Sequence, residues 1–215
     1  IDLVAGVESD STVVWYENVD GNGNFQIKQF IETNLENLQY VILFDLDGDN
    51  DLDVVVSSQS NGRIAWYENT DGKGLFGAPK IVTEKEAYWP TCAIFCDLDN
   101  DADLDVLAAS TKDNRIFWYE NIDGQGNFGA QKIISTTALE AQSVFSSDLD
   151  GDGDLDVLSS SRGDNKMAWY ENVDGQGNFG PEQVLSSYGN GELSTHISAS
   201  DLDGDGDMDV LTVSS

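Results

Sequence analysis

Nine residues in the second half of the chain concentrate metal-binding chemistry: segment 148–156 reads DLDGDGDLD. Its five carboxylates repel one another strongly unless a cation lies among them. Side chains at positions 1, 3 and 5 of such a loop can converge on one point, and a glycine at position 6 permits the sharp turn. Position 7 can offer its backbone carbonyl. The spacing therefore suits a hard divalent cation with oxygen ligands.

The last carboxylate distinguishes this segment from an EF-hand, in which a Glu at position 12 closes the site from a helix. Here Asp156 closes the loop at position 9, and the Val and Leu that follow at once are typical of a β-strand. We therefore predict a calcium loop inside a β-hairpin. Its expected side-chain ligands are Asp148, Asp150, Asp152 and Asp156, with Asp154 acting through its carbonyl.

The same acidic loop occurs four times, at 45–53, 97–105, 148–156 and 201–209, with constant spacing. Apolar residues typical of strands flank the loops, which argues against a solvated acidic tail. Magnesium fits less well than calcium, because it keeps its waters rather than enter a cage of five carboxylates. The predicted metal residues are Asp45, Asp47, Asp49, Asp51, Asp53, Asp97, Asp99, Asp101, Asp103, Asp105, Asp148, Asp150, Asp152, Asp154, Asp156, Asp201, Asp203, Asp205, Asp207 and Asp209.

Charge supports this interpretation. The 215 residues carry 40 acidic and 10 basic side chains, a formal charge of −30, and half of the acids lie in the four loops. The charge is therefore mostly an ion-binding signature. Nucleic acid is disfavoured as a partner, because phosphate binding needs clustered Lys and Arg.

The two cysteines and the apolar segments give little evidence about function. Cys92 and Cys96 would lie about 13 Å apart on one face of a strand, too far for a disulfide, so we expect both to be small apolar core residues. No segment has the length of a membrane span, and no signal peptide precedes Ile1. We expect a mature product or an excised piece.

Internal repetition indicates the fold class. The acidic loops start at 45, 97, 148 and 201, at intervals of 52, 51 and 53 residues. A WYEN tetrapeptide recurs, beginning at Trp15, Trp66, Trp118 and Trp169, and an Asp-Gly-x-Gly segment follows each copy, beginning at Asp20, Asp71, Asp123 and Asp174.

One period divides into four short strands. In the second repeat we expect strands at 40–44, 52–58, 63–69 and 78–83, joined by hairpin turns that use Asn-Gly and Asp-Gly. No stretch has helical periodicity over three turns. Four-stranded antiparallel sheets that repeat about every 50 residues indicate a β-propeller, here one all-β region over residues 1–215.

These landmarks give the chain a resemblance to tandem FG-GAP or VCBS-type repeats, the unit of the integrin α-subunit propeller, of many secreted bacterial proteins and of some fungal lectins. Segment 76–79 reads FGAP, and 128–130 and 179–181 match it in part. Segment 25–27 departs from it, and loop 97–105 has Asn100 and Ala102 where the family has glycines. The resemblance implies a calcium-binding propeller with protein or glycan partners.

Other residues have two interpretations. The WYEN aromatics are sugar-stacking platforms or, as we expect, packing between sheets. The Asp-Gly-x-Gly segments are expected to form turns with Asx hydrogen bonds rather than further ion sites. His196 is the only histidine. We expect it to be a wall residue near the central channel of the propeller rather than a catalytic base.

In a propeller the acidic loops and Asp-Gly turns lie on one face of the sheets. On the opposite face we expect the divergent connections 32–38, 84–90 with Tyr88 and Trp89, 135–141 and 186–194. The same face receives half of the basic residues, namely Arg63, Lys112, Arg115, Arg162 and Lys166. Ligand binding would be built there, although Arg63, Arg115 and Lys166 can equally be residues that bracket the sheet edges.

We expect a calcium-binding propeller module of a secreted or cell-surface protein that mediates protein or glycan binding in adhesion. The alternatives are a carbohydrate-binding lectin, or a part of a polysaccharide-degrading enzyme, which would need a pocket of His, Tyr, Arg or Lys. The repeat predicts seventeen strands, which is neither the 16 of four sheets nor the 20 of five. We therefore expect a segment of a larger propeller, prone to self-association.

Overall fold

The computed structural model describes residues 2–7, 10–33, 35, 37–60, 62–84, 89–187 and 194–214. Within these ranges the chain forms seventeen β-strands, and no helix there is long and apolar enough to cross a membrane. Tyr88, and most of the 186–194 connection, lie outside the described residues. The chain divides into two compact units, residues 1–90 and 91–215.

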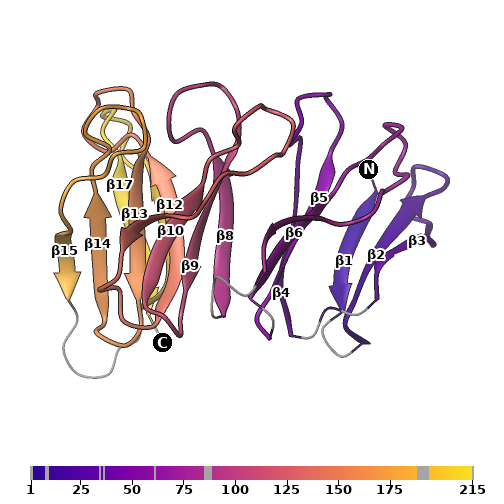
Figure 1. Cartoon of the computed structure of the whole chain (residues 1–215), viewed down its shortest axis with the longest axis horizontal. Coiled ribbons are helices and arrows are strands. Elements are labelled where there is room, and N and C mark those ends of the chain that lie inside the picture. The colour runs from indigo at the N-terminus through magenta and orange to yellow at the C-terminus, as the bar shows by residue number, and fades with distance from the viewer. Residues whose placement is uncertain are drawn as a thin grey trace. The chain divides into compact units, whose positions relative to one another are not determined.

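The first unit contains two antiparallel sheets (Figure 1). A three-stranded sheet orders its strands as they occur in the chain: β1 (Leu3–Val7), β2 (Thr12–Asn18) and β3 (Phe25–Glu32). A four-stranded sheet follows, with β4 (Leu38–Phe44), β5 (Asp53–Ser58), β6 (Arg63–Tyr67) and β7 (Lys80–Thr83).

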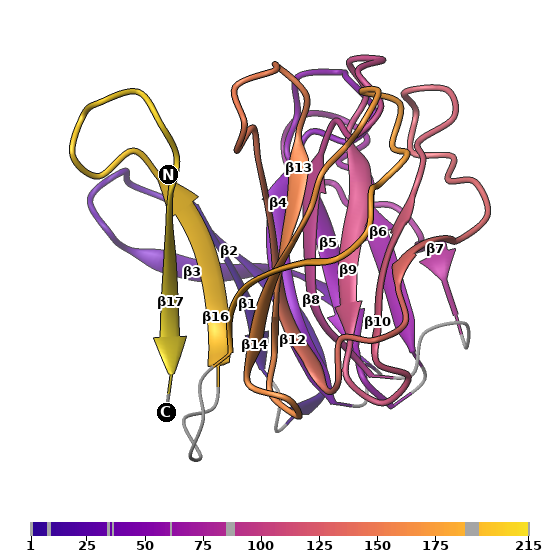
Figure 2. The same ribbon diagram turned by 90° about the vertical axis from the view of Figure 1, so that its left-hand side faces the viewer.

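The second unit repeats the four-stranded sheet twice. The first copy contains β8 (Pro90–Cys96), β9 (Asp105–Ser110), β10 (Arg115–Tyr119) and β11 (Lys132–Ser135), and the second contains β12 (Ala141–Ser147), β13 (Asp156–Ser161), β14 (Lys166–Tyr170) and β15 (Gln183–Ser187). A two-stranded hairpin, β16 (Ser194–Ser200) and β17 (Asp209–Ser214), ends the unit, and Figure 2 shows its long connecting loop. The predicted all-β class and its four-stranded antiparallel sheets are confirmed.

Each of the four strands expected in the second repeat has one boundary that differs from prediction, and the first two begin at Leu38 rather than 40 and at Asp53 rather than 52. The strand expected at 63–69 ends at Tyr67; beyond it Asn69 pairs with Phe76 only in an isolated bridge, and its N–H donates to the Asp53 carboxylate (2.9 Å). The strand expected at 78–83 begins at Lys80, because the chain folds back at Gly77, whose N–H donates to the Glu68 carbonyl (2.9 Å). In the first repeat, which has Gln26 in place of this glycine, β3 runs unbroken from Phe25.

The aromatic residues of WYEN are packing residues, as expected. Trp66, Trp118, Tyr67, Tyr119 and Tyr170 are among the largest fully buried side chains of the described residues. In the second unit, Trp118 on β10 and Tyr170 on β14 belong to one apolar cluster that spans both four-stranded sheets. Burial of such rings contributes on the order of 25 cal/mol per Å² of apolar surface, so this cluster holds the two sheets together.

A lysine covers the tryptophan in three of the four repeats. Lys80 lies 4.1 Å from the centre of the Trp66 ring and pairs with Glu68 at 2.7 Å. Lys28 with Trp15, and Lys132 with Trp118, repeat the arrangement. In the fourth repeat Gln183 contacts Glu171 instead (3.4 Å). These lysines therefore cover a face of the tryptophan ring, where the cation–π contact is favourable.

Both cysteines are free thiols, as predicted, with Cys96 buried and Cys92 half-buried. Burial raises the pKa of the Cys92 thiol and raises that of Cys96 to about 12. Thiols in such surroundings are poor nucleophiles.

Candidate functional site

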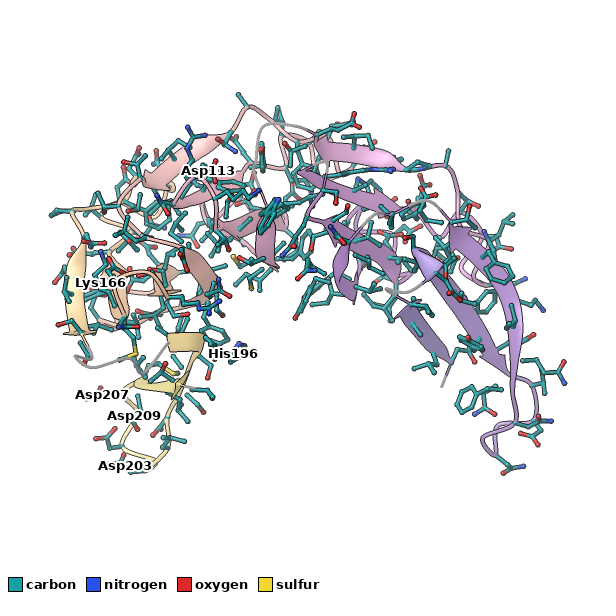
Figure 3. The ribbon with its side chains drawn as sticks, turned by 90° about the horizontal axis from the view of Figure 1, so that it is seen from below. Asp113, Lys166, His196, Asp203, Asp207 and Asp209 are labelled. Atoms are coloured by element: carbon teal, nitrogen blue, oxygen red, sulfur yellow. The ribbon has the colours of Figure 1, made fainter. Side chains whose placement is uncertain are left out.

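Each acidic loop brings three carboxylates together. In every loop positions 1 and 3 converge with one further Asp, and their closest oxygens lie within 4.8 Å of one another. The third member is position 9 in the first and last loops and position 5 in the middle two. The groups are Asp45, Asp47 and Asp53; Asp97, Asp99 and Asp101; Asp148, Asp150 and Asp152; and Asp201, Asp203 and Asp209. Figure 3 shows Asp203 on the loop between β16 and β17 and Asp209 at the start of β17.

Backbone amides hold the position-1 carboxylate. Asp148 accepts the N–H of Gly151 through Oδ1 (2.8 Å) and the N–H of Gly153 through Oδ2 (3.1 Å). Asp45 and Asp201 accept the same pair of amides in their loops. To aim their N–H groups inward, residues 4 and 6 need positive φ, which glycine adopts at little cost.

Non-glycine residues take that conformation in two loops. Position 6 is Asn50 in the first loop and Ala102 in the second, with φ of 70° and 73°. Asn100, at position 4 of the second loop, has φ of 59°. Ala102 thus adopts the conformation that glycine has in the other loops, and its Cβ makes it costly by about 1 kcal/mol.

Position 9 fastens the loop to the sheet. Asp105 is fully buried, and its two oxygens accept the N–H groups of Leu98 and Asn121, both at 2.9 Å. Burial raises the pKa of Asp105 to about 7 despite these two hydrogen bonds. Asp53 is bound in the same way, and burial raises its pKa to about 6. Asp2, which aligns with Asp53 when segment 1–4 is placed on segment 52–55, accepts the Asn18 N–H in the same way (3.0 Å).

The donor set fits a hard cation. Asp47 Oδ1 and Asp99 Oδ1 are buried without a hydrogen-bond partner, and both residues belong to a group of convergent carboxylates. Burial, followed by the charge of Asp101, raises the pKa of Asp99 to about 6. A buried, unpaired carboxylate oxygen is costly unless a cation binds it, and oxygen ligands at this spacing suit calcium.

The position-7 side chains turn away from the convergent groups. The carboxylate of Asp51 lies against Gly72, that of Asp103 against Gly124 and that of Asp154 against Gly175. Each of these glycines belongs to an Asp-Gly-x-Gly turn, so the acidic loop and this turn lie at the same end of a sheet. The arrangement agrees with a role for position 7 through its carbonyl, which remains a prediction.

The Asp-Gly-x-Gly segments form Asx turns, as predicted. Asp71 Oδ1 accepts the N–H groups of Lys73 (2.9 Å) and Leu75 (3.1 Å). Their second glycine has another role, because a Cβ on Gly177 would lie 2.2 Å from the ring of Trp118 in the preceding sheet. Gly74 lies on Trp15 in the same way. This glycine is therefore required for close packing of one sheet on the next.

The WYEN asparagine has a structural role that was not predicted from the sequence. In the fourth repeat Asn172 is fully buried, and its N–H donates to Asp156 Oδ1 (2.8 Å). Its side-chain amide donates to the carbonyl of Leu98 in the preceding loop (2.9 Å). The same asparagine ends all four WYEN copies, and this repetition was the sequence signal that could have predicted its role.

An open cavity of about 430 Å³ lies in the first unit, lined by Val4, Trp15, Asn69 and Phe76 among others. In the second unit the corresponding residues surround Leu98, which is buried against Trp118 and Phe179. The cavity thus has the shape of a packing position for a loop leucine, and it is no repeated ligand pocket.

Three of the five basic residues expected on the opposite face form ion pairs. Arg63 contacts Glu32 (3.6 Å), Arg115 contacts Asp113 (3.4 Å), and Lys166 contacts both Asp164 (3.1 Å) and Glu182 (2.8 Å). Both predicted roles, ligand binding and bracketing of the sheet edge, remain compatible with these pairs.

The Lys166 cluster gathers several polar groups. Glu182 Oε1 also accepts the Tyr170 hydroxyl (3.1 Å) and the Thr137 hydroxyl (3.4 Å), while Lys166 donates to the Thr137 carbonyl (3.3 Å). The side chains of Lys166 and Glu182 keep 11% and 24% of their surface exposed, so this cluster is half-buried yet reachable from solvent.

His196 is exposed on β16, and its Nδ1 lies 3.4 Å from Ser143 Oγ (Figure 3). This contact is at the long limit of a hydrogen bond. Among the described residues, no hydrogen bond or ion pair joins His196 to a carboxylate. The pair therefore lacks the third group that orients a catalytic histidine.

Comparison with protein families identifies the repeat. The model of the FG-GAP-like repeat matches residues 45–108, 97–159 and 148–212. This chain belongs to the FG-GAP-like repeat family. No curated protein sequence matches it significantly.

Solved structures share the fold of this FG-GAP-like chain. An Agrocybe aegerita lectin, described as recognising non-reducing terminal N-acetylglucosamine, aligns with 99% of the chain at 18% identity and a TM-score of 0.66. The V. cholerae biofilm matrix protein Bap1 aligns with 98% at 17% identity (TM-score 0.55), and the Streptococcus pneumoniae sialidase NanB with 94% at 11% identity (0.54). The chain spans 60%, 30% and 32% of these structures.

Proposed function

We propose that this chain is a calcium-binding, propeller-type module that acts outside the cell and binds glycans. In this proposal the acidic loops bind calcium and rigidify one end of each sheet. The glycan contacts polar groups at the other end. The module itself is non-catalytic.

The calcium assignment rests above all on the buried, unpaired oxygens of Asp47 and Asp99 inside groups of convergent carboxylates. Positions 1, 3, 5 and 9 would supply carboxylates, and position 7 its carbonyl. Bound calcium would offset the mutual repulsion of the carboxylates, so binding free energy becomes folding free energy. Exposed calcium sites of extracellular modules bind at roughly 10⁻⁴–10⁻³ M, which suits the calcium-rich exterior of the cell.

Thermal unfolding of the chain tests this assignment. With 2 mM calcium we expect a melting temperature at least about 10 °C above that in EDTA, because several sites contribute together. Magnesium at the same concentration is the control and should restore little of the difference. Identical melting curves in calcium and EDTA would refute the assignment.

The glycan assignment is supported by the likeness to the N-acetylglucosamine lectin and by the Lys166 cluster. A carboxylate such as Glu182 can accept a hydrogen bond from a sugar hydroxyl, while the Lys166 ammonium and the Tyr170 hydroxyl can donate to sugar oxygens. The cluster is half-buried, so a ligand would meet groups that are already positioned.

A glycan array, read with and without calcium, tests this part. We expect binding to glycans that end in N-acetylglucosamine, with loss of binding in EDTA. Glu182→Gln should weaken it at least tenfold, whereas Glu120→Gln, which disrupts the more exposed ion pair with Lys132 on the preceding sheet, should not. An array with no bound glycan would refute the glycan assignment and leave calcium binding intact.

A protein partner is the second candidate, supported by the likeness to the biofilm matrix protein. It would use the same exposed end of the sheets, and its binding would survive enzymatic removal of glycans from the partner. Glycan-independent capture by a defined partner would favour this candidate.

A further inference from the structure

We propose that the acidic loops 97–105 and 148–156 bind calcium cooperatively, through two asparagines that connect them. This inference rests on the calcium binding proposed above and adds an energetic link between neighbouring sites. Both loops belong to the second unit, so their contacts lie within one compact body.

The first link starts at Asn100, position 4 of loop 97–105. Its side-chain amide donates to Asp154 Oδ1 at 2.7 Å and to the Gly175 carbonyl at 3.3 Å. Asp154 is position 7 of the neighbouring loop, the residue expected to offer its carbonyl to the ion. A charge-assisted hydrogen bond of this length holds the Asp154 side chain outward and fixes the backbone beside the site.

The second link passes through the buried Asn172. Its backbone N–H binds Asp156, the position-9 carboxylate of one loop, while its side-chain amide binds the Leu98 carbonyl of the other. The Leu98 N–H in turn binds Asp105, the position-9 carboxylate of the first loop (2.9 Å). A continuous chain of hydrogen bonds therefore joins the two closing carboxylates.

These links give the coupling a physical cause. An ion in loop 97–105 would immobilise Asn100 and Leu98, which reduces the conformational freedom that the neighbouring loop must lose when its own ion binds. The coupling must be reciprocal, because binding free energies are linked. Couplings of this kind change affinity about 5- to 150-fold.

The next pair of loops provides an internal control. Position 4 of loop 148–156 is Gly151, which has no side chain to reach loop 201–209. The hairpin that carries loop 201–209 has no third strand in the described part of the chain, so no asparagine corresponding to Asn172 binds Asp209 there. Loops 148–156 and 201–209 should therefore bind calcium almost independently.

The test is a calcium titration of the full chain, followed through the amide NMR signals of Gly153 and Gly206, which report the two loops separately. Asp99→Asn with Asp101→Asn disables loop 97–105. We expect the Gly153 midpoint to rise, by an amount that grows with the coupling up to about fivefold because the weaker loop 97–105 is only partly filled there, and the Gly206 midpoint to stay unchanged. An unchanged Gly153 midpoint, or an equal change at both glycines, would overturn the proposal.

Asn100→Gly provides the second variant, because it restores the glycine found at position 4 of the other three loops and keeps all carboxylates. We expect it to weaken the effect of disabling loop 97–105 on Gly153 by at least half. If the full effect persists, the Asn100 link is wrong. If neither glycine signal responds to calcium in any variant, calcium binding and cooperativity both fail.

Discussion

Loops 97–105 and 201–209 carry the same five carboxylates but lie in different surroundings. The first connects β8 and β9 in a complete four-stranded sheet. Its closing residue Asp105 is fully buried and accepts hydrogen bonds from two backbone N–H groups. The second connects a two-stranded hairpin, where Asp209 is exposed and accepts the Leu202 N–H (3.1 Å). The carboxylate pattern alone therefore does not set the energetics of a loop, because the third strand decides how strongly its closing residue is desolvated.

The largest difference between the two loops should appear in how the melting temperature depends on pH in calcium-free solution. Burial raises the pKa of Asp53 and Asp99 to about 6 and that of Asp105 to about 7. The folded state thus binds these protons more tightly than the unfolded state, and the resulting stability is lost as pH rises through about 6 to 7. In EDTA the melting temperature should be higher at pH 5 than at pH 8.

Asp105→Asn should reduce this pH dependence, and Asp209→Asn should leave it nearly unchanged. With saturating calcium the trend should reverse, because protons compete with the ion for the carboxylates. A melting temperature in EDTA that rises from pH 5 to pH 8 would contradict the argument.

The second prediction compares the stability, in calcium buffer, of two variants that each lack the position-9 carboxylate of one loop. Asp105→Ala leaves the buried N–H groups of Leu98 and Asn121 without an acceptor, at a cost of about 1–3 kcal/mol each. Asp209→Ala removes the same charge at an exposed position. We expect the first variant to be less stable than the second by about 2–4 kcal/mol in urea unfolding. Equal losses would mean that the charge, rather than the buried amides, determines the cost.

Sequence pattern predicted much of this molecule. The three landmarks of each repeat placed the strands, the acidic loops and the buried rings, since their spacing depends only on local turn chemistry and alternation. The end of one strand at Tyr67 and the start of the next at Lys80 were predicted wrongly, because the chain folds back at Gly77, whose N–H donates to the Glu68 carbonyl. The hydrogen bond between Asn100 and Asp154 could not be predicted from the sequence either, since contacts between repeats depend on how the sheets pack.

The third contrast concerns the glycines that lie on tryptophan. Gly177 and Gly23 are equivalent residues, both with positive φ (69° and 97°), but only a Cβ on Gly177 would meet a neighbour, the Trp118 ring. Alanine at either position costs about 1 kcal/mol in backbone strain. At Gly177 it adds overpacking of about 1–3 kcal/mol.

In thermal unfolding, Gly177→Ala should therefore have a clearly lower melting temperature than Gly23→Ala. Tryptophan emission should change in the Gly177→Ala variant alone. Equal melting temperatures would show that the ring moves aside without cost.

The smallest effect is expected at Ala102, and it concerns binding rather than burial. Ala102 is position 6 of loop 97–105, where its N–H donates to Asp97 Oδ2 (2.9 Å) from a φ of 73°. Loops 148–156 and 201–209 have glycine there, and Asn50 tolerates this conformation better than alanine does. The strain should make loop 97–105 the weakest of the four calcium sites. Ala102→Gly should relieve about 1 kcal/mol and tighten that site about fivefold in a calcium titration. Gly153→Ala is the reciprocal variant and should weaken loop 148–156 by a similar factor. If both variants leave the affinities unchanged, the loops reach their calcium-bound backbone without the strain inferred from φ.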